Sequence, residues 1–247
     1  MAMFQFGSGV LLGARTDIAN STPVNFGLIQ EVQLDLSFTT KELYGQNQFA
    51  VAIARGTAKM TGKAKMAQVS GLAFNNLFFG TNVSGGYTAS SIGEAAAVPA
   101  SSPYTVTVAH AATFIADYGV VYAATGLPLT LAASSPDAGA YSVSAGVYTF
   151  SSGDAGKAVL INYIYTAASG GQKIAFVNQP IGTTPTFSAQ LYTTFQGKTA
   201  TVSLYNCVSS KLSYATKLED FTIPELDFSV FANADGNVLD WSFSEAS

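Results

Sequence analysis

The sequence predicts a mainly β protein with one helical segment, and three observations indicate this class. Apolar and polar residues alternate over long stretches, which is the period of strands with one buried face. Turn-forming residues, among them 23 Gly and 8 Pro in 247 residues, separate these stretches. Residues 66–79 instead space their apolar side chains as an amphipathic helix does, and Gly80 follows where a helix C-cap belongs.

The first expected strands lie in the N-terminal third. Residues 32–38 alternate from Val32 to Phe38, and residues 49–53 do the same. Residues 55–65 also alternate, and they place three lysines on one face: Lys59, Lys63 and Lys65. Shorter strands are expected in the middle of the chain, over residues 104–109, 119–123, 128–132, 140–144, 147–150 and 158–166.

The C-terminal part predicts a closing hairpin. Residues 226–230 alternate, Asp235-Gly236 is a hairpin turn signal, and residues 238–243 would form the return strand. Trp241 is expected in the core of this strand pair. Each part of the hairpin thus has its own local signal.

Charge and glycine divide the chain into two domains. Residues 87–172 carry one lysine and four acidic residues, whereas residues 1–86 carry six basic and four acidic ones. The turn-prone joints Ser84-Gly85-Gly86 and Ser169-Gly170-Gly171 bound the charge-poor part. We interpret 84–172 as a β-sandwich inserted into a host domain made of 1–83 and 173–247.

Composition excludes several classes of protein. Only 11% of residues are charged, against about 25% in typical soluble domains, and the net charge of −4 disfavours a basic nucleic-acid reader. One Cys and one His exclude a disulfide framework and multi-imidazole zinc sites. Scarce charge favours burial against other subunits over an uncharged secreted or cell-surface protein. We expect no signal peptide and no membrane helix, hence synthesis in a cytoplasm.

No constellation predicts catalysis. His110 ends an alternating strand, and Cys207 lies in an apolar run with no second histidine elsewhere to pair with. The Asp154-Ala155-Gly156-Lys157 turn lacks the flanking residues of a phosphate loop. We therefore expect no enzyme, no cofactor and no metal.

The lysine cluster has three readings. The reading without a function is that Lys59, Lys63 and Lys65 form a solvated face. The functional reading is that they contact the acidic part of a neighbouring subunit. DNA binding is a weaker third option. The acidic candidates for such an inter-subunit contact are Glu219, Asp220 and Glu225.

Two regions resemble a known family. Residues 27–66, with the loop KELYGQNQF and the run RGTAKMTGKAK, and the ending FTIPELDFSVFANADGNVLDWSFSE are similar to bacteriophage tail tube (major tail) proteins. Residues 146–165 resemble Ig-like modules inserted in virion proteins. The resemblance implies a tail-tube-like β-barrel or sandwich flanked by one helix, with an inserted Ig-like β-sandwich.

The family also implies a function. Its members assemble with themselves into stacked, usually hexameric rings that form the tail tube, and they contact other phage tail proteins. Double-stranded DNA passes through the lumen without specific binding, and no membrane is involved. The expected location is the virion tail, assembled in the host bacterial cytoplasm. A capsid decoration or fibre-like protein is the alternative; a secreted adhesin and an enzyme rank lower.

Two sets of residues follow from this expectation. A lumen must not retain DNA, so neutral or acidic side chains should line it, and the alternation assigns this wet face to Gln33, Asp35, Ser37, Asp227, Ser229 and Asp240. A long polar loop, residues 40–49, is expected to reach an adjacent subunit through Glu42, Leu43, Tyr44, Gly45, Gln46, Asn47 and Gln48. The N-terminal arm is a further candidate contact.

Overall fold

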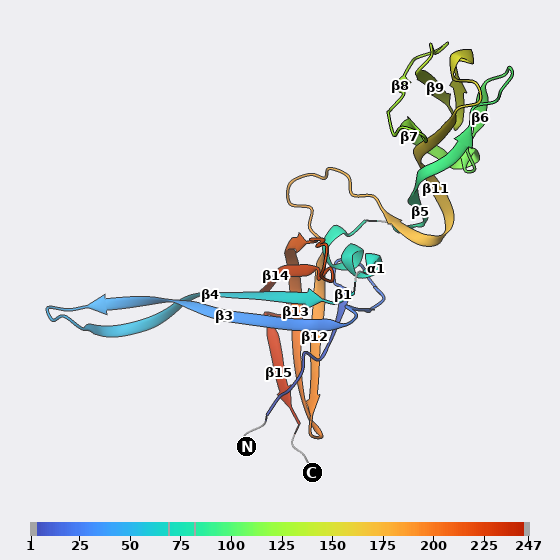
Figure 1. Ribbon diagram of the computed structural model, residues 1–247. Coiled ribbons are helices and arrows are strands. Elements are labelled where there is room, and N and C mark those ends of the chain that lie inside the picture. The colour runs from blue at the N-terminus through green and yellow to red at the C-terminus, as the bar shows by residue number, and fades with distance from the viewer. Residues whose placement is uncertain (1–3, 69, 82, 245–247) are drawn as a thin grey trace. The chain divides into compact units, whose positions relative to one another are not determined.

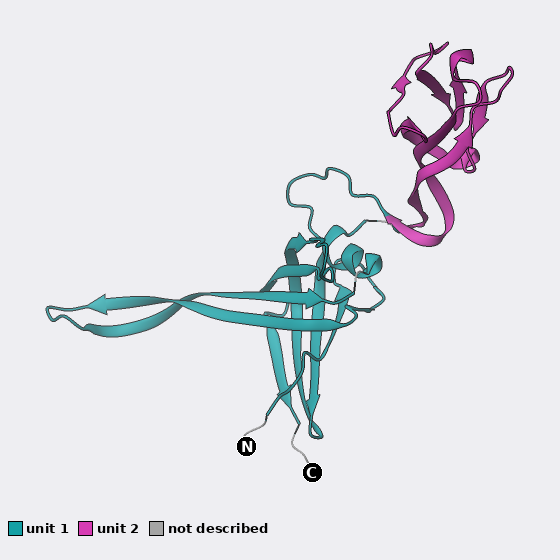
Figure 2. Cartoon of the chain, viewed as in Figure 1, with its two compact units in different colours: residues 1–83, 174–247 teal, residues 84–173 magenta. Residues whose placement is uncertain are grey.

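The computed structural model describes residues 4–68, 70–81 and 83–244. The chain divides into two compact units: unit 1 comprises residues 1–83 and 174–247, and unit 2 comprises residues 84–173 (Figure 2). Each unit has a hydrophobic core of its own. None of the helices within the described ranges has the length and apolarity that crossing a membrane requires.

Unit 1 is built on an antiparallel sheet of eight strands (Figure 1). The strands are β1 (Val10–Arg15), β2 (Val24–Asn25), β3 (Ile29–Tyr44), β4 (Ala50–Met66), β12 (Thr186–Phe195), β13 (Lys198–Ser213), β14 (Glu225–Phe231) and β15 (Leu239–Phe243). Their order is β2-β1-β12-β13-β14-β4-β3, and β15 pairs with β13. Among the described strands the sheet is open. The closed-barrel form of the expectation is therefore wrong, because β3 leaves the sheet with β4 instead of returning to β2.

The core of unit 1 lies on one face of this sheet. Phe187 and Phe228 are fully buried and pack edge-to-face, with ring centroids 5.9 Å apart. Gly62 on β4 lies beneath the Phe228 ring, where any Cβ would collide with it. Phe26 and Leu77 cover the same face from outside the sheet. The alternation of each strand therefore sorts its side chains into this core and a polar opposite face.

The helical segment is shorter than residues 66–79. Met66 still belongs to β4, where it pairs with Ile29. Helix α1 (Gly71–Phe74) begins only after Ser70, whose hydroxyl accepts a hydrogen bond from the Ala73 amide. It continues as one π-helical turn, η1 (Asn75–Phe79), and ends at a left-handed Gly80. The helix that the apolar spacing predicts is therefore present, but the residues expected in its first turn include Met66, which belongs to β4.

The expected C-terminal hairpin is wrong. β14 pairs with residues 206–213 of β13, and β15 pairs with residues 200–204 of the same strand. The two strands therefore run in the same direction, one after the other along β13. The turn signal is real, since Asn233 accepts hydrogen bonds from the amides of Asp235 and Asn237, but it closes a loop between consecutive strands.

Unit 2 consists of two small sheets around an apolar core. One sheet has the order β5-β11-β7, and the other has the order β6-β10-β9-β8. The strands are β5 (Val83–Ala97), β6 (Thr105–Thr107), β7 (Phe114–Tyr122), β8 (Thr130–Leu131), β9 (Ala140–Ser144), β10 (Val147–Phe150) and β11 (Ala158–Ile174); short 3-10 turns are η2 (Ala111–Thr113) and η3 (Ser152–Asp154). Tyr148, Ile161 and Tyr163 are fully buried between the sheets.

The two glycine joints are strand, not loop. Ser84-Gly85-Gly86 lies in β5 and Ser169-Gly170-Gly171 lies in β11, and these strands pair with each other. The Ser84 hydroxyl donates to the carbonyl of Lys173 at 3.3 Å. Gly86 adopts a positive φ of 83° inside its strand. Glycine here permits irregular strand geometry, so its turn signal was misleading.

A buried carboxylate stabilises unit 2. Asp154 is fully buried and accepts hydrogen bonds from the Tyr122 hydroxyl at 2.6 Å, the Gly139 amide at 2.8 Å and the Lys157 ammonium at 2.8 Å. Burial by itself raises the pKa of Asp154. The hydrogen bonds outweigh that effect, and they hold the pKa below its ordinary value of 3.8. The folded unit therefore favours the charged carboxylate.

This shift predicts acid sensitivity of unit 2. Because the folded pKa of Asp154 is depressed, its contribution to the free energy of unfolding is complete above the unfolded pKa, about 3.9, and is lost as pH falls through the folded value. Asp154→Asn should cost about 1.5–3 kcal/mol at pH 7, since it removes hydrogen bonds to a charged group. Calorimetry should show this gap closing below pH 4. A gap that is constant from pH 7 to pH 2, or one shared by the exposed control Asp137→Asn, would contradict the assignment.

Candidate assembly surfaces

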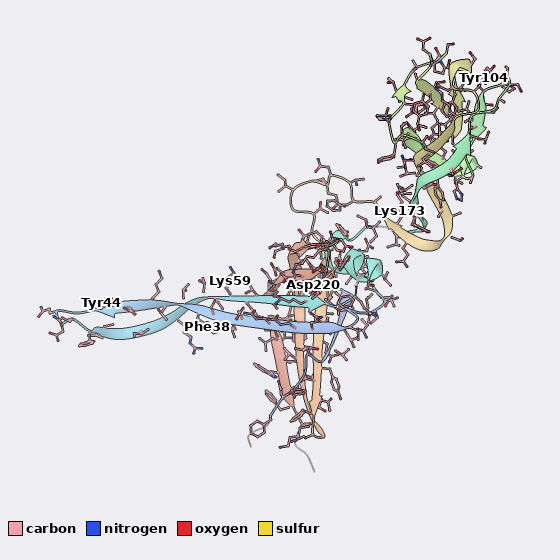
Figure 3. The ribbon with its side chains drawn as sticks, viewed as in Figure 1. Phe38, Tyr44, Lys59, Tyr104, Lys173 and Asp220 are labelled. Carbon is pink, nitrogen blue, oxygen red and sulfur yellow. The ribbon has the colours of Figure 1, made fainter. Side chains whose placement is uncertain are left out.

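The β3–β4 hairpin of unit 1 extends far beyond the sheet that carries it (Figure 1). β4 pairs with β14 only over residues 60–65, whereas it pairs with β3 along nearly its whole length. Beyond that point the two strands pair only with each other. Figure 3 labels Phe38 and Lys59 along this ribbon and Tyr44 near its end.

The distal hairpin exposes large apolar side chains. The exposed fractions are 63% for Leu43, 85% for Phe49 and 64% for Ile53. The register pairs Leu43 with Ala52 and Glu42 with Ile53, so apolar side chains appear on both faces of the ribbon. A two-stranded hairpin without a covered face is marginally stable in water. The distal hairpin therefore requires a covering surface.

The first half of the expected contact loop is strand. Residues 40–44 form the end of β3, and only residues 45–49 make the turn. Tyr44 donates a hydrogen bond to the Glu42 carboxylate. Polar composition suggested a loop, but an exposed strand carries polar residues on both faces as readily as a loop does. The candidate residues 42–48 thus lie at the tip of a projecting ribbon.

The six candidate lumen residues share the face of the sheet opposite the core. Gln33, Asp35 and Ser37 alternate with core-side residues of β3, and Asp227 and Ser229 do the same on β14. Asp240 pairs with Ser203 on the same face and accepts a hydrogen bond from the Tyr205 hydroxyl. The structure therefore brings these residues onto one polar face, and it places none of them in the core.

That polar face also carries basic side chains, whereas only neutral or acidic ones are expected to face a lumen. Lys59, Lys63 and Lys65 occupy it as well, because the register places them beside Ser37, Gln33 and Glu31. Lys211 of β13 joins them beside Asp227. Sequence reasoning missed Lys211, because no local pattern shows that β13 pairs with β14 and so places Lys211 beside Asp227.

The candidate inter-subunit charges are largely paired within the chain. The ammonium of Lys63 lies 2.7 Å from the Glu225 carboxylate, and that of Lys65 lies 2.5 Å from Glu31. Asp220 pairs with Lys217 at 3.1 Å. Glu219 is exposed in the loop that precedes β14. Lys63 and Glu225 are therefore neighbours within one sheet, and a contact of these charged residues across subunits stays a prediction.

An apolar groove continues the core face toward the open end of the sheet. It has a volume of about 310 Å³, and β3 contributes Val32, Leu34 and Leu36 to its lining. Trp241 lines the opposite wall and is 60% exposed, contrary to the expected core position. This residue points to the core side of β15, but the sheet there has no cover. The groove is a second surface suited to contact with another chain.

The remaining candidate residues have structural surroundings. The His110 ring stacks on Tyr165 with centroids 3.8 Å apart. Burial raises the pKa of the Cys207 thiol to about 12. Within the described ranges no three of the ligand-type residues His, Cys, Asp and Glu gather as a metal site requires.

Comparison with known proteins gives no relative: no family model matches the chain, and no curated protein matches it. The assignment of a role therefore depends on the geometry of these surfaces and on the resemblance noted in the sequence.

Proposed function

We propose that this protein is a structural subunit that assembles with copies of itself into stacked rings and so forms the tube of a bacteriophage tail; the resemblance noted in the sequence implies hexameric rings. One observation carries the proposal: the β3–β4 hairpin projects from its sheet and leaves Leu43, Phe49 and Ile53 uncovered by the part of the chain that the structure describes. Burying such side chains stabilises an assembly by about 25 cal/mol per Å² of apolar surface.

The arrangement of surfaces supports a heterologous contact. The hairpin tip and the apolar groove are different surfaces of the same unit, so a contact between the tip of one copy and another surface of the next leaves both copies able to extend the assembly. Contacts of this kind close into rings or continue as filaments. The open edge of β3 offers a further pairing site, since an exposed strand edge readily accepts another chain.

In this proposal the polar face of unit 1 lines the lumen through which double-stranded DNA passes during ejection. The tube contacts itself and other phage tail proteins, and the protein belongs to the virion tail. The test is electron microscopy of the purified chain. Rings or hollow tubes support the proposal, and a monomer that binds capsids instead favours the decoration or fibre-like role.

A further inference from the structure

Strands β3, β4, β14 and β13 place four lysines and four carboxylates on the polar face of the unit 1 sheet, and Asp240 of β15 adds a fifth carboxylate to the same face. The lysines are Lys59, Lys63, Lys65 and Lys211, and the first four carboxylates are Glu31, Asp35, Glu225 and Asp227. The formal charges of these eight side chains cancel. They come from four adjacent strands, β3, β4, β14 and β13, so the balance is a property of the folded sheet and not of any single segment.

Register places a carboxylate beside three of the lysines. Lys65 lies between Glu31 on β3 and Glu225 on β14. Asp227 lies between Lys63 on β4 and Lys211 on β13. Two ammonium groups reach a carboxylate directly, at 2.5 Å for Lys65 and 2.7 Å for Lys63.

The charges of this face also shift one another's pKa. A hydrogen bond to Glu225 raises the pKa of Lys63, and the carboxylates of Asp227 and Glu31 act in the same direction. The hydrogen bond from Lys63 lowers the pKa of Glu225, with further help from Lys65 and Lys211. Lys63 and Glu225 therefore lie in the field of opposite charges on neighbouring strands.

Without the carboxylates, the lysines would suit a DNA backbone. Alternate residues of a strand lie roughly 6.8 Å apart, as Lys63 and Lys65 do on β4. Ammonium groups this close together can neutralise neighbouring phosphates of a duplex. A row of free ammonium groups with this spacing would bind phosphates and release counter-ions. The paired carboxylates remove this gain in binding free energy, because a phosphate must first displace a carboxylate from each lysine.

We infer that Glu31, Glu225 and Asp227 are built-in counter-ions, which keep the lysines of this face from retaining double-stranded DNA. The identity of the polyanion rests on the proposed function, whereas the pairing itself does not. The lysines of this face then form cross-strand ion pairs within the sheet, and double-stranded DNA can pass the face without being retained.

The test compares two triple variants with the same change in net charge. Glu31→Gln/Glu225→Gln/Asp227→Asn removes the counter-ions, and the control Asp137→Asn/Glu219→Gln/Asp235→Asn removes three exposed carboxylates elsewhere. Full-length chains are kept unassembled at low concentration, as checked by light scattering. Fluorescence anisotropy then measures binding of a labelled 30-base-pair duplex over a salt series.

The counter-ion variant should bind the duplex at least about tenfold more tightly than the control. The slope of log affinity against log salt should be steeper by about 3, at roughly 0.9 for each of the three lysines that lose a neighbouring carboxylate. Adding Lys59→Gln, Lys63→Gln, Lys65→Gln and Lys211→Gln to this variant should return binding to the control level. Equal binding by the two triple variants overturns the inference, as does binding that survives loss of the lysines.

Circular dichroism must show the same strand content in all variants. If the triple variant is unfolded, Glu225→Gln alone, compared with Glu219→Gln, takes its place, with a slope steeper by about 1. Electron microscopy of the unaltered chain separates the two proposals. Tubes without gained DNA binding overturn only the counter-ion role, whereas gained binding without tubes overturns only the tail-tube role.

Discussion

Deleting residues 42–48 should abolish self-assembly and leave a folded monomer. The segment forms the tip of the β3–β4 hairpin, where Leu43 and its neighbours are exposed and where, among the described strands, β3 pairs with β4 alone. Shortening a projecting ribbon leaves the core of unit 1 untouched, because β4 enters that core only from Met60 onward. Electron microscopy and size-exclusion chromatography should show the loss of rings at all concentrations.

Point variants sharpen this prediction. Leu43→Ser/Phe49→Ser/Ile53→Ser removes the apolar side chains but keeps the ribbon. The matched control is Ile92→Ser/Leu127→Ser/Leu131→Ser, which removes three side chains of unit 2 with exposed fractions of 77%, 62% and 57%. Only the hairpin variant should fail to assemble. If both triple variants form tubes, the tip is not the contact that holds the copies together.

Phe228→Ala should destabilise unit 1 by about 3–5 kcal/mol, the cost of truncating a buried phenylalanine. Phe228 fills the space above Gly62 and packs against Phe187 in the centre of the core, so the surrounding backbone cannot collapse into the cavity. For a unit of this size the melting temperature should fall by roughly 10 °C. Scanning calorimetry of the unassembled chain measures this shift.

The same experiment tests the separation of the two cores. The transition of unit 2 should stay where it is in Phe228→Ala, because Phe228 belongs to the core of unit 1 and unit 2 has a core of its own. Tyr148→Ala provides the reciprocal variant, which should lower only the transition of unit 2. One shared transition that moves in both variants would contradict two independent cores.

Alternation alone predicted much of unit 1. It placed residues 32–38 and 55–65 on strands and sorted Gln33, Asp35 and Asp227 onto a non-core face, which is where they lie. Period-two patterns succeed here because one face of the sheet is buried, so that a one-residue slip would expose the core.

Local signals failed where tertiary pairing decided the outcome. Asp235-Gly236 makes a turn, but β14 and β15 both pair with β13, and no local sequence encodes that choice. The glycine joints looked like flexible linkers and proved to be paired strands. Lys211 lies beside Asp227 because β13 pairs with β14, and this long-range pairing has no signal in a single sequence.

The candidate surfaces could be predicted only in part. The polar composition of residues 40–49 predicts a loop that contacts an adjacent subunit. The ribbon also exposes two apolar side chains of this segment, Leu43 and Phe49. The pairing of Lys63 with Glu225 joins residues that are distant in sequence, so only the sheet register shows that these charges meet within one chain.

The most direct test of self-assembly is negative-stain electron microscopy of the purified, unaltered chain over a concentration series. The account predicts rings at intermediate concentration and hollow tubes at high concentration, both absent from the 42–48 deletion at matched concentrations. A chain that stays monomeric throughout the series, and also remains so when purified tail initiator complexes are added, would contradict it.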